Sequence, residues 1–152
     1  MKVRSLVLLL AIALAVSLPV SAQLRCETVG GVLMTNINVI AGVTNLGPVF
    51  GDLQGSVGAT ILSQNGDGTF TVQHYWVTSS GDTILFRPAT LKPTATDDPN
   101  VVAVKWGNYI SDIAGGAGKY LNAIGSLSYF GLADFKQLTL VLRYTGQVCY
   151  PQ

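Results

Sequence analysis

The sequence has few charged residues, and this shortage excludes several classes of protein. Only 11% of its 152 residues are Asp, Glu, Lys or Arg, whereas globular proteins average about 25%. Nine basic and eight acidic side chains leave a formal net charge of +1, and the basic residues from Arg25 to Arg143 are scattered singly. Nucleic-acid-binding proteins gather basic residues on one surface. We therefore expect neither a disordered polyelectrolyte nor a nucleic-acid-binding protein.

Histidine and cysteine are equally scarce, with one His and two Cys in the chain. A single histidine cannot supply a His-rich zinc site, and neither Gly-x-Ser-x-Gly nor His-Glu-x-x-His occurs in the sequence. Asn-x-Ser/Thr, the acceptor motif for N-glycosylation, is also absent. We predict that the protein uses no metal and no cofactor.

No apolar run is long enough for a membrane-spanning helix, which needs about 20 residues. The longest, from Leu6 to Val16, is 11 residues long and follows the basic residues Lys2 and Arg4. Small residues at Ser21 and Ala22 then provide a cleavage site, as in a secretory signal peptide. We predict a signal peptide over 1–22 and one domain over 23–152. The protein would be secreted or periplasmic, and only the signal peptide would meet a membrane.

The two cysteines, Cys26 and Cys149, lie near the two ends of the predicted mature chain. An even number of cysteines in an exported protein favours a disulfide, and only one pairing is possible. Such a bond would close a loop of 123 residues and, on the chain-entropy model, stabilise the fold by about 5 kcal/mol. The alternative, a reactive or metal-binding pair, lacks a neighbouring Cys or His.

The apolar pattern after the signal peptide is that of an all-β chain. No segment keeps a helical period, and short β-branched and aromatic runs alternate with Gly, Asn, Asp and Pro clusters. Asn65 to Gly68 and Ser79 to Asp82 are typical of tight hairpins, and Pro93 to Pro99 is predicted to be an extended loop. The predicted strands are 25–29, 32–40, 55–63, 69–78, 83–91, 101–109, 124–130 and 138–148.

Alternation along two of these segments predicts which side chains face inward. His74 and Trp76 share their face with Phe70 and Val72, whereas the last segment turns its even-numbered residues, 138 to 144, toward the core. Seven or eight such strands in about 130 residues fit a small closed antiparallel barrel, whose interior is packed or holds one small ligand. A two-sheet sandwich is the alternative.

One glycine cluster resembles a known family. Residues 115–125, Gly-Gly-Ala-Gly-Lys-Tyr-Leu-Asn-Ala-Ile-Gly, are similar to the Gly-Gly-Thr-Gly-x-aromatic-x-x-Ala-x-Gly signature of dirigent proteins and the related allene oxide cyclases, with Ala117 in place of Thr. The resemblance implies an eight-stranded, calycin-like barrel over most of 25–150. It also implies a small apolar or phenolic ligand in the barrel mouth, and self-association, since several members form trimers. The signature carries over no catalytic residue.

The same glycines have a purely structural reading. Gly115, Gly116, Gly118 and Gly125 allow positive φ and close chain approach, which predicts a bulged turn entering a strand, with Tyr120 and Ala123 packed beneath it. The run is not a phosphate-binding loop, because the residue after its lysine is neither Ser nor Thr.

A second set of candidates consists of His74 and five aromatic residues. His74 is the only side chain whose ordinary pKa allows acid–base chemistry near neutrality. It has three possible roles: a hydrogen-bonded core histidine, a polar group in a ligand pocket, or a catalytic base. The aromatic residues come from different predicted strands and either line a ligand site or pack as core. The candidate ligand-binding residues are His74, Trp76, Phe86, Trp106, Tyr129 and Tyr144.

Three functions follow. The first is an exported barrel that binds a small apolar or phenolic molecule without catalysis, which the glycine cluster, the aromatic faces and the shortage of charge favour. The second is a cyclase-type or dirigent-type enzyme, which would need a charged residue facing the cavity, with Asp52, Arg87 and Asp112 as the residues to inspect. The third is an eight-stranded outer-membrane barrel, which would need a lipid-facing apolar band and a polar lumen.

Overall fold

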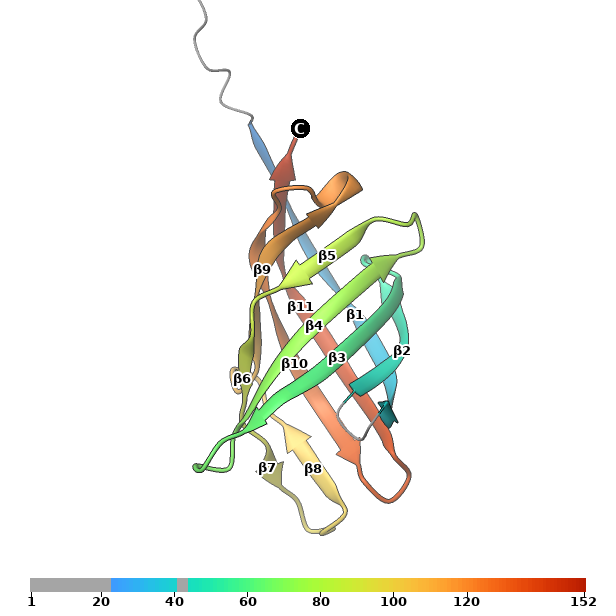
Figure 1. Cartoon of the computed structure of the whole chain (residues 1–152), viewed down its shortest axis with the longest axis vertical. Coiled ribbons are helices and arrows are strands. Elements are labelled where there is room, and N and C mark those ends of the chain that lie inside the picture. Colours follow the sequence, from blue (N-terminus) through green and yellow to red (C-terminus); the bar gives the residue numbers. More distant parts are fainter. Residues whose placement is uncertain (1–22, 41–43) are drawn as a thin grey trace, which may run out of the picture.

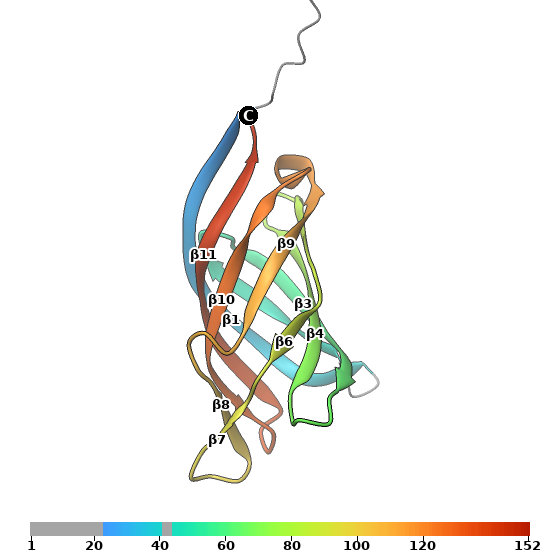
Figure 2. The same ribbon diagram turned by 90° about the vertical axis from the view of Figure 1, so that its left-hand side faces the viewer.

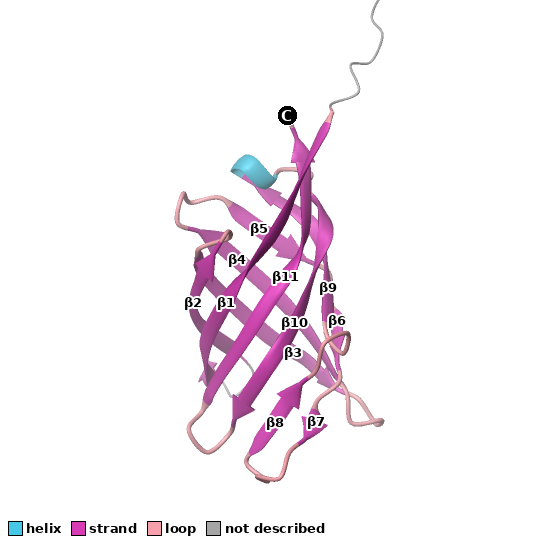
Figure 3. Cartoon of the chain, turned by 180° about the vertical axis from the view of Figure 1, so that it is seen from behind, coloured by secondary structure: helices cyan, strands magenta, loops and turns pink. Residues whose placement is uncertain are grey.

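The computed structural model describes residues 23–40 and 44–152, so the predicted signal peptide lies outside the described residues. The described chain forms one tilted barrel, with both termini at the same end and the β7–β8 hairpin at the other (Figure 1). A single 3₁₀ turn, η1, lies near the end that carries the termini (Figure 3). No helix among these residues is long and apolar enough to cross a membrane. The elements are β1 (Leu24–Ile40), β2 (Thr44–Gly51), β3 (Gly55–Gln64), β4 (Phe70–Thr78), β5 (Thr83–Phe86), β6 (Ala89–Leu91), β7 (Thr94–Ala95), β8 (Val101–Val104), β9 (Ile110–Ala117), η1 (Gly118–Tyr120), β10 (Ile124–Asp134) and β11 (Thr139–Pro151).

The strands close into a complete ring. They pair in the order β11, β1, β2, β3, β4, β5, β9, β10, and the pairing of β10 with β11 closes the barrel. Every pairing is antiparallel, and β6 continues along β4 beyond the end of β5. The β7–β8 hairpin extends from β10 outside the ring (Figure 2). The predicted all-β, eight-stranded closed barrel is confirmed, and the sandwich alternative is wrong.

Alternate residues of the long strands point into the barrel, as the sequence pattern predicts. Along β4, Val72, His74 and Trp76 are buried while Tyr75 and Val77 are exposed. Along β11, Leu142 and Tyr144 are buried, whereas Val141 and Arg143 are exposed. Leu138 is an exception, because it lies in the β10–β11 turn with φ 55° and is exposed.

The interior is apolar and aromatic. Trp76, Phe86, Leu127, Tyr129 and Tyr144 are each at most 2% exposed and belong to one hydrophobic core cluster. Burying them removes apolar surface from water, which is the main driving force for folding. An outer-membrane barrel would instead need a polar lumen, so this interior gives that alternative no support.

Several predicted segment boundaries are wrong, for identifiable reasons. β1 is one strand of 17 residues rather than two pieces. Two strands were not predicted: β2, where Gly47 and Pro48 interrupt the apolar pattern, and β9, where Ser111, Asp112 and two glycines do so. Gly47 suits its place because a methyl group there would overlap the Met34 carbonyl of β1. The predicted strand 101–109 ends at residue 104, and the predicted loop 93–99 contains β7.

Both predicted hairpin turns are confirmed. The Asn65 amide donates to the Thr69 carbonyl over 2.8 Å, which closes the β3–β4 turn. The Thr78 amide donates to the Asp82 carbonyl over the same distance and closes the β4–β5 turn. These backbone bonds set the register of β3 against β4 and of β4 against β5.

The predicted disulfide between Cys26 and Cys149 is also confirmed. The two residues lie directly opposite each other on the paired strands β1 and β11. The bond therefore joins the first and last strands of the barrel near their outer ends.

The glycine cluster lies where the chain passes from β9 through η1 to β10. Gly115 faces Leu85 beside a β-bulge in the β5–β9 pairing, and η1 then leads toward β10. Gly115, Gly118 and Gly125 all have positive φ. Tyr120 and Ala123 are buried, as expected for residues packed beneath the turn.

Gly116 provides a test of this close packing. A methyl group on Gly116 would overlap the Thr83 carbonyl of the neighbouring strand. We expect Gly116→Ala to lower the free energy of unfolding by about 1–3 kcal/mol, because overpacking forces the backbone apart. Gly66→Ala is the control, since nothing lies within 4 Å of a methyl group there. Urea denaturation measures both, and equal stabilities would contradict the prediction.

Candidate functional site

The barrel contains two adjoining hollows toward the end that carries the β7–β8 hairpin. The inner hollow, about 50 Å³, lies beside His74 and Tyr109, whereas the outer hollow, about 100 Å³, lies beside Pro93 and Phe135. We call the two together the cavity. Both hollows are lined by Asn45, Ile61, Leu91 and Leu140.

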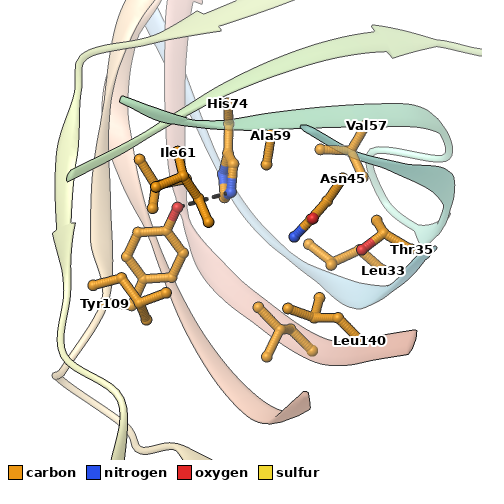
Figure 4. Close-up of a pocket in the computed structure, with 12 residues that line it drawn as sticks. Leu33, Thr35, Asn45, Val57, Ala59, Ile61, His74, Tyr109 and Leu140 are labelled. Atoms are coloured by element: carbon orange, nitrogen blue, oxygen red, sulfur yellow. Dashed lines mark hydrogen bonds between the residues drawn. The ribbon is translucent and has the colours of Figure 1, made fainter. Parts of the chain in front are cut away.

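Strands from across the ring build the wall of the cavity. Figure 4 shows Leu33 and Thr35 of β1 with Asn45 of β2 on one side of the inner hollow, and His74 with Tyr109 on the other. The rest of the lining is aliphatic or aromatic, apart from Pro93. The cavity is therefore apolar with a few polar groups, which is the usual composition of a small-molecule site.

His74 lies between two tyrosine hydroxyl groups. Its Nε2 is 2.9 Å from the Tyr109 Oη, and its Nδ1 is 3.1 Å from the Tyr129 Oη. In a neutral imidazole one nitrogen donates and the other accepts, so both ring nitrogens are satisfied. The two aromatic rings also meet the imidazole edge-on.

Burial fixes the charge state of this group. Desolvation lowers the pKa of His74 from 6.5 to about 3, because the charged form loses its hydration. The same effect raises the pKa of Tyr109 and of Tyr129 above the ordinary value of 10. At neutral pH all three side chains are uncharged, so the group offers hydrogen bonds rather than a base of matched pKa.

Thr35 carries a polar atom without a partner. The residue is 4% exposed, lines the inner hollow, and has no hydrogen bond to its Oγ1 among the described residues. Asn45, which presents an amide to both hollows, lies beside it (Figure 4). An unsatisfied buried hydroxyl costs about 1–3 kcal/mol, so this atom marks a place where a further polar group would be favourable.

Only one of the six candidate ligand-binding residues lines the two hollows, namely His74. Four of the others are packed in the core, and Tyr144 is fixed there by its hydroxyl, which accepts a hydrogen bond from the Leu53 amide over 3.1 Å. The expectation that Trp106 points into the barrel is wrong. It follows β8, which lies outside the ring, is 60% exposed and packs against Phe130.

The three charged residues that could serve an enzyme do not line the cavity. Asp52, Arg87 and Asp112 are all exposed. The Asp52 carboxylate accepts a hydrogen bond from the Gly30 amide over 2.8 Å. Neither hollow is lined by Asp, Glu, Lys or Arg, and no group of three or more potential metal ligands occurs within 23–40 and 44–152.

Sequence reasoning missed the residues that complete the cavity. Leu33 and Thr35 occupy alternate positions of a predicted strand, so extending the alternation rule to β1 would have found them. Asn45 lies in the unpredicted β2, and Tyr109 precedes the unpredicted β9. Nothing in their local sequence shows that these two residues meet across the barrel.

Comparison with known proteins finds matches among solved structures, but none among family models or curated proteins. Among solved structures, a pterocarpan synthase dirigent protein aligns with 90% of this chain and 95% of its own, at 12% identity and a TM-score of 0.39. The barrel itself is shown by the strand pairing described above, and a specific relation to allene oxide cyclases stays a prediction.

Proposed function

We propose that this protein is an exported β-barrel that binds a small apolar or phenolic molecule inside the barrel. The observation that carries this proposal is the apolar cavity beside His74, with an unpartnered buried hydroxyl at Thr35. Exposed apolar patches have many causes, but an interior hollow lined by apolar groups and a few polar ones is a typical ligand site.

The cavity limits the size of the ligand. The inner and outer hollows measure about 50 and 100 Å³, whereas sites for drug-sized ligands measure about 300–1,000 Å³. An apolar cavity of about 150 Å³ in an engineered protein holds benzene. The ligand that fits is therefore a single ring or a short branched chain.

Two observations support export. Disulfides persist in oxidising compartments, and the Cys26–Cys149 bond is of this kind. The residues before the described barrel have the charge and apolar pattern of a signal peptide. Mass spectrometry of the protein recovered from outside the cytoplasm would detect the cleavage expected after Ala22.

Binding without turnover is the simpler function for this cavity. A cyclase-type enzyme would need a charged group facing the ligand, and the residues lining the hollows include none. His74 is held neutral and is bonded at both nitrogens. No specific feature of the cavity favours the enzyme.

Filling the cavity tests the proposal. Ala59 is buried on β3 and lines the inner hollow, so Ala59→Leu would place three more carbon atoms there. We expect this change to weaken the binding of toluene at least about tenfold, since overpacked sites do not accommodate extra volume without strain. Titration followed by NMR of the cavity methyl groups, including Val57 and Ile61, measures the affinity.

Thr60→Leu is the matched control, because Thr60 is the next residue of β3 and points to the opposite face. It should leave toluene binding unchanged. If neither toluene nor benzene shifts the cavity methyl signals of the unmodified protein, the interior is not a binding site and the proposal fails.

A further inference from the structure

We propose that the cavity selects an uncharged ligand that carries one hydrogen-bonding oxygen, and that Thr35 and Asn45 hold this oxygen. This inference rests on the proposed function and adds the ligand's charge and its orientation. Two kinds of observation carry it: the unpartnered hydroxyl of Thr35, and the chemistry of the residues that surround the cavity.

The first step concerns the Thr35 hydroxyl. A hydroxyl that is removed from water usually bonds a protein group or an ordered water, and the Thr35 Oγ1 bonds no described residue. It borders a hollow rather than solid packing. A ligand oxygen that enters the hollow can therefore complete a hydrogen bond that the protein alone leaves unmade.

The second step concerns Asn45, which stands on the same side of the inner hollow as Thr35 (Figure 4). Its amide has both a donor and an acceptor, and a threonine hydroxyl also has both. Together they match an alcohol or a carbonyl oxygen. The opposite side carries His74 and Tyr109, which already bond each other over 2.9 Å, so the ligand meets its best polar partners on the β1–β2 side.

The third step concerns charge. Among the described residues, His74 and Tyr109 are the only ionisable side chains lining the two hollows, and neither is charged at neutral pH. A carboxylate or ammonium placed there would lose its hydration and find no opposite charge, which is strongly unfavourable. The cavity should therefore reject ions that are similar in size to the neutral ligand.

The fourth step gives the orientation. Thr35 borders the inner hollow, whereas the outer hollow continues past Leu140 to Pro93, Val102 and Phe135. Of the described residues that line the outer hollow, Asn45 alone has a polar side chain. The ligand oxygen would thus lie inside, at Thr35, with the apolar part directed toward the β7–β8 hairpin.

Three single-ring probes test the inference by isothermal titration calorimetry at pH 7: toluene, benzyl alcohol and benzoate. Thr35→Val removes the hydroxyl while keeping the shape of the side chain. We expect it to weaken benzyl alcohol about tenfold, the value of one neutral hydrogen bond, and to leave toluene unchanged or slightly tighter. Benzoate should bind the unmodified protein at least about a hundredfold more weakly than benzyl alcohol, because its charge is desolvated.

Two further variants control for a loss of folding and for the substitution itself. Thr35→Ser retains the hydroxyl and should keep the affinity for benzyl alcohol, which separates the loss of the hydrogen bond from a loss of folding. Thr28→Val makes the same change at an exposed position of β1 and should alter neither affinity.

The inference would be overturned if benzoate bound as tightly as benzyl alcohol, or if Thr35→Val weakened toluene and benzyl alcohol equally. Either result with toluene still bound leaves the proposed function intact. If the unmodified protein binds none of the three probes, the proposed function and this inference fail together.

Discussion

Acidification from pH 6.5 to pH 4.5 is expected to lower the free energy of unfolding by about 2 kcal/mol through His74 alone. The pKa of His74 is about 3 in the folded barrel and 6.5 when the side chain is free in water. Between these values the unfolded chain binds a proton that the folded chain does not bind. Stability therefore falls as the pH falls through this window, by about 1.4 kcal/mol for each pH unit.

The surroundings of His74 explain why the folded protein resists protonation. The Tyr109 and Tyr129 hydroxyl groups bond the ring at its two nitrogens, and Phe86 packs against it in a T-shaped arrangement. Burial raises the pKa of both tyrosines, so neither ionises in the acid range to balance an imidazolium. A charged His74 would thus be buried without a counter-ion, which is costly.

His74→Gln provides the comparison. Glutamine retains a donor and an acceptor but does not titrate. Guanidinium denaturation at pH 6.5 and pH 4.5 should show a loss of stability of about 2 kcal/mol in the unmodified protein and much less in the variant. Parallel losses in the two proteins would contradict the assigned role of His74.

The chosen window separates His74 from the carboxylates. Hydrogen bonds from neighbouring hydroxyl groups hold the pKa values of three of them below the ordinary values of 4.5 or 3.8, so these groups also destabilise the fold in acid, but mainly below pH 4.5. The three carboxylates are Glu27, Asp67 and Asp82.

Loss of the Cys26–Cys149 bond is the second large effect that we expect. The bond closes a loop of 123 residues, and the chain-entropy model assigns about 5 kcal/mol to a loop of that length. Replacing both cysteines with serine should lower the free energy of unfolding by about this amount. Denaturant titration of the variant beside the unmodified protein, with and without a thiol reductant, measures the effect.

The reductant supplies its own control. It should destabilise the unmodified protein to the level of the double variant and leave the double variant unchanged. Hydrogen exchange should also become faster in the strand ends joined by the bond, Leu24 to Val29 of β1 and their partners in β11. A loss of stability below about 1 kcal/mol would show that this cross-link does not restrict the unfolded chain as the model assumes.

The long alternating strands were predictable because burial follows a period of two. In β4 and β11 most residues on the inward face are large and apolar, so the sequence alone indicates that face. The turns at Asn65 and Ser79 were predictable for a similar local reason, since Gly and Asp tolerate the required backbone angles. The disulfide followed from having only two cysteines in the chain.

The parts of the structure that could not be predicted from the sequence depend on contacts between distant segments. β2 contains Gly47, which is needed because β1 approaches it too closely for a side chain, and no local rule detects such a contact. The cavity joins Thr35, Asn45, His74 and Tyr109 only because the ring closes. Trp106 is an error of another kind, because local sequence placed a residue inside that is in fact exposed. It was assigned to the interior as an aromatic residue of the predicted strand 101–109, but it follows β8, which lies outside the ring.

The pairing of β1 with β11 also constrains the order in which the protein can fold. β1 needs β2 on one edge and the last strand of the chain on the other. While the chain is still being synthesised, β1 therefore has an open edge, and exposed strand edges promote aggregation. The ring can close only when residues 139–151 are available. A chain that crosses a membrane unfolded and folds afterwards, with every strand present, would avoid a long-lived open edge.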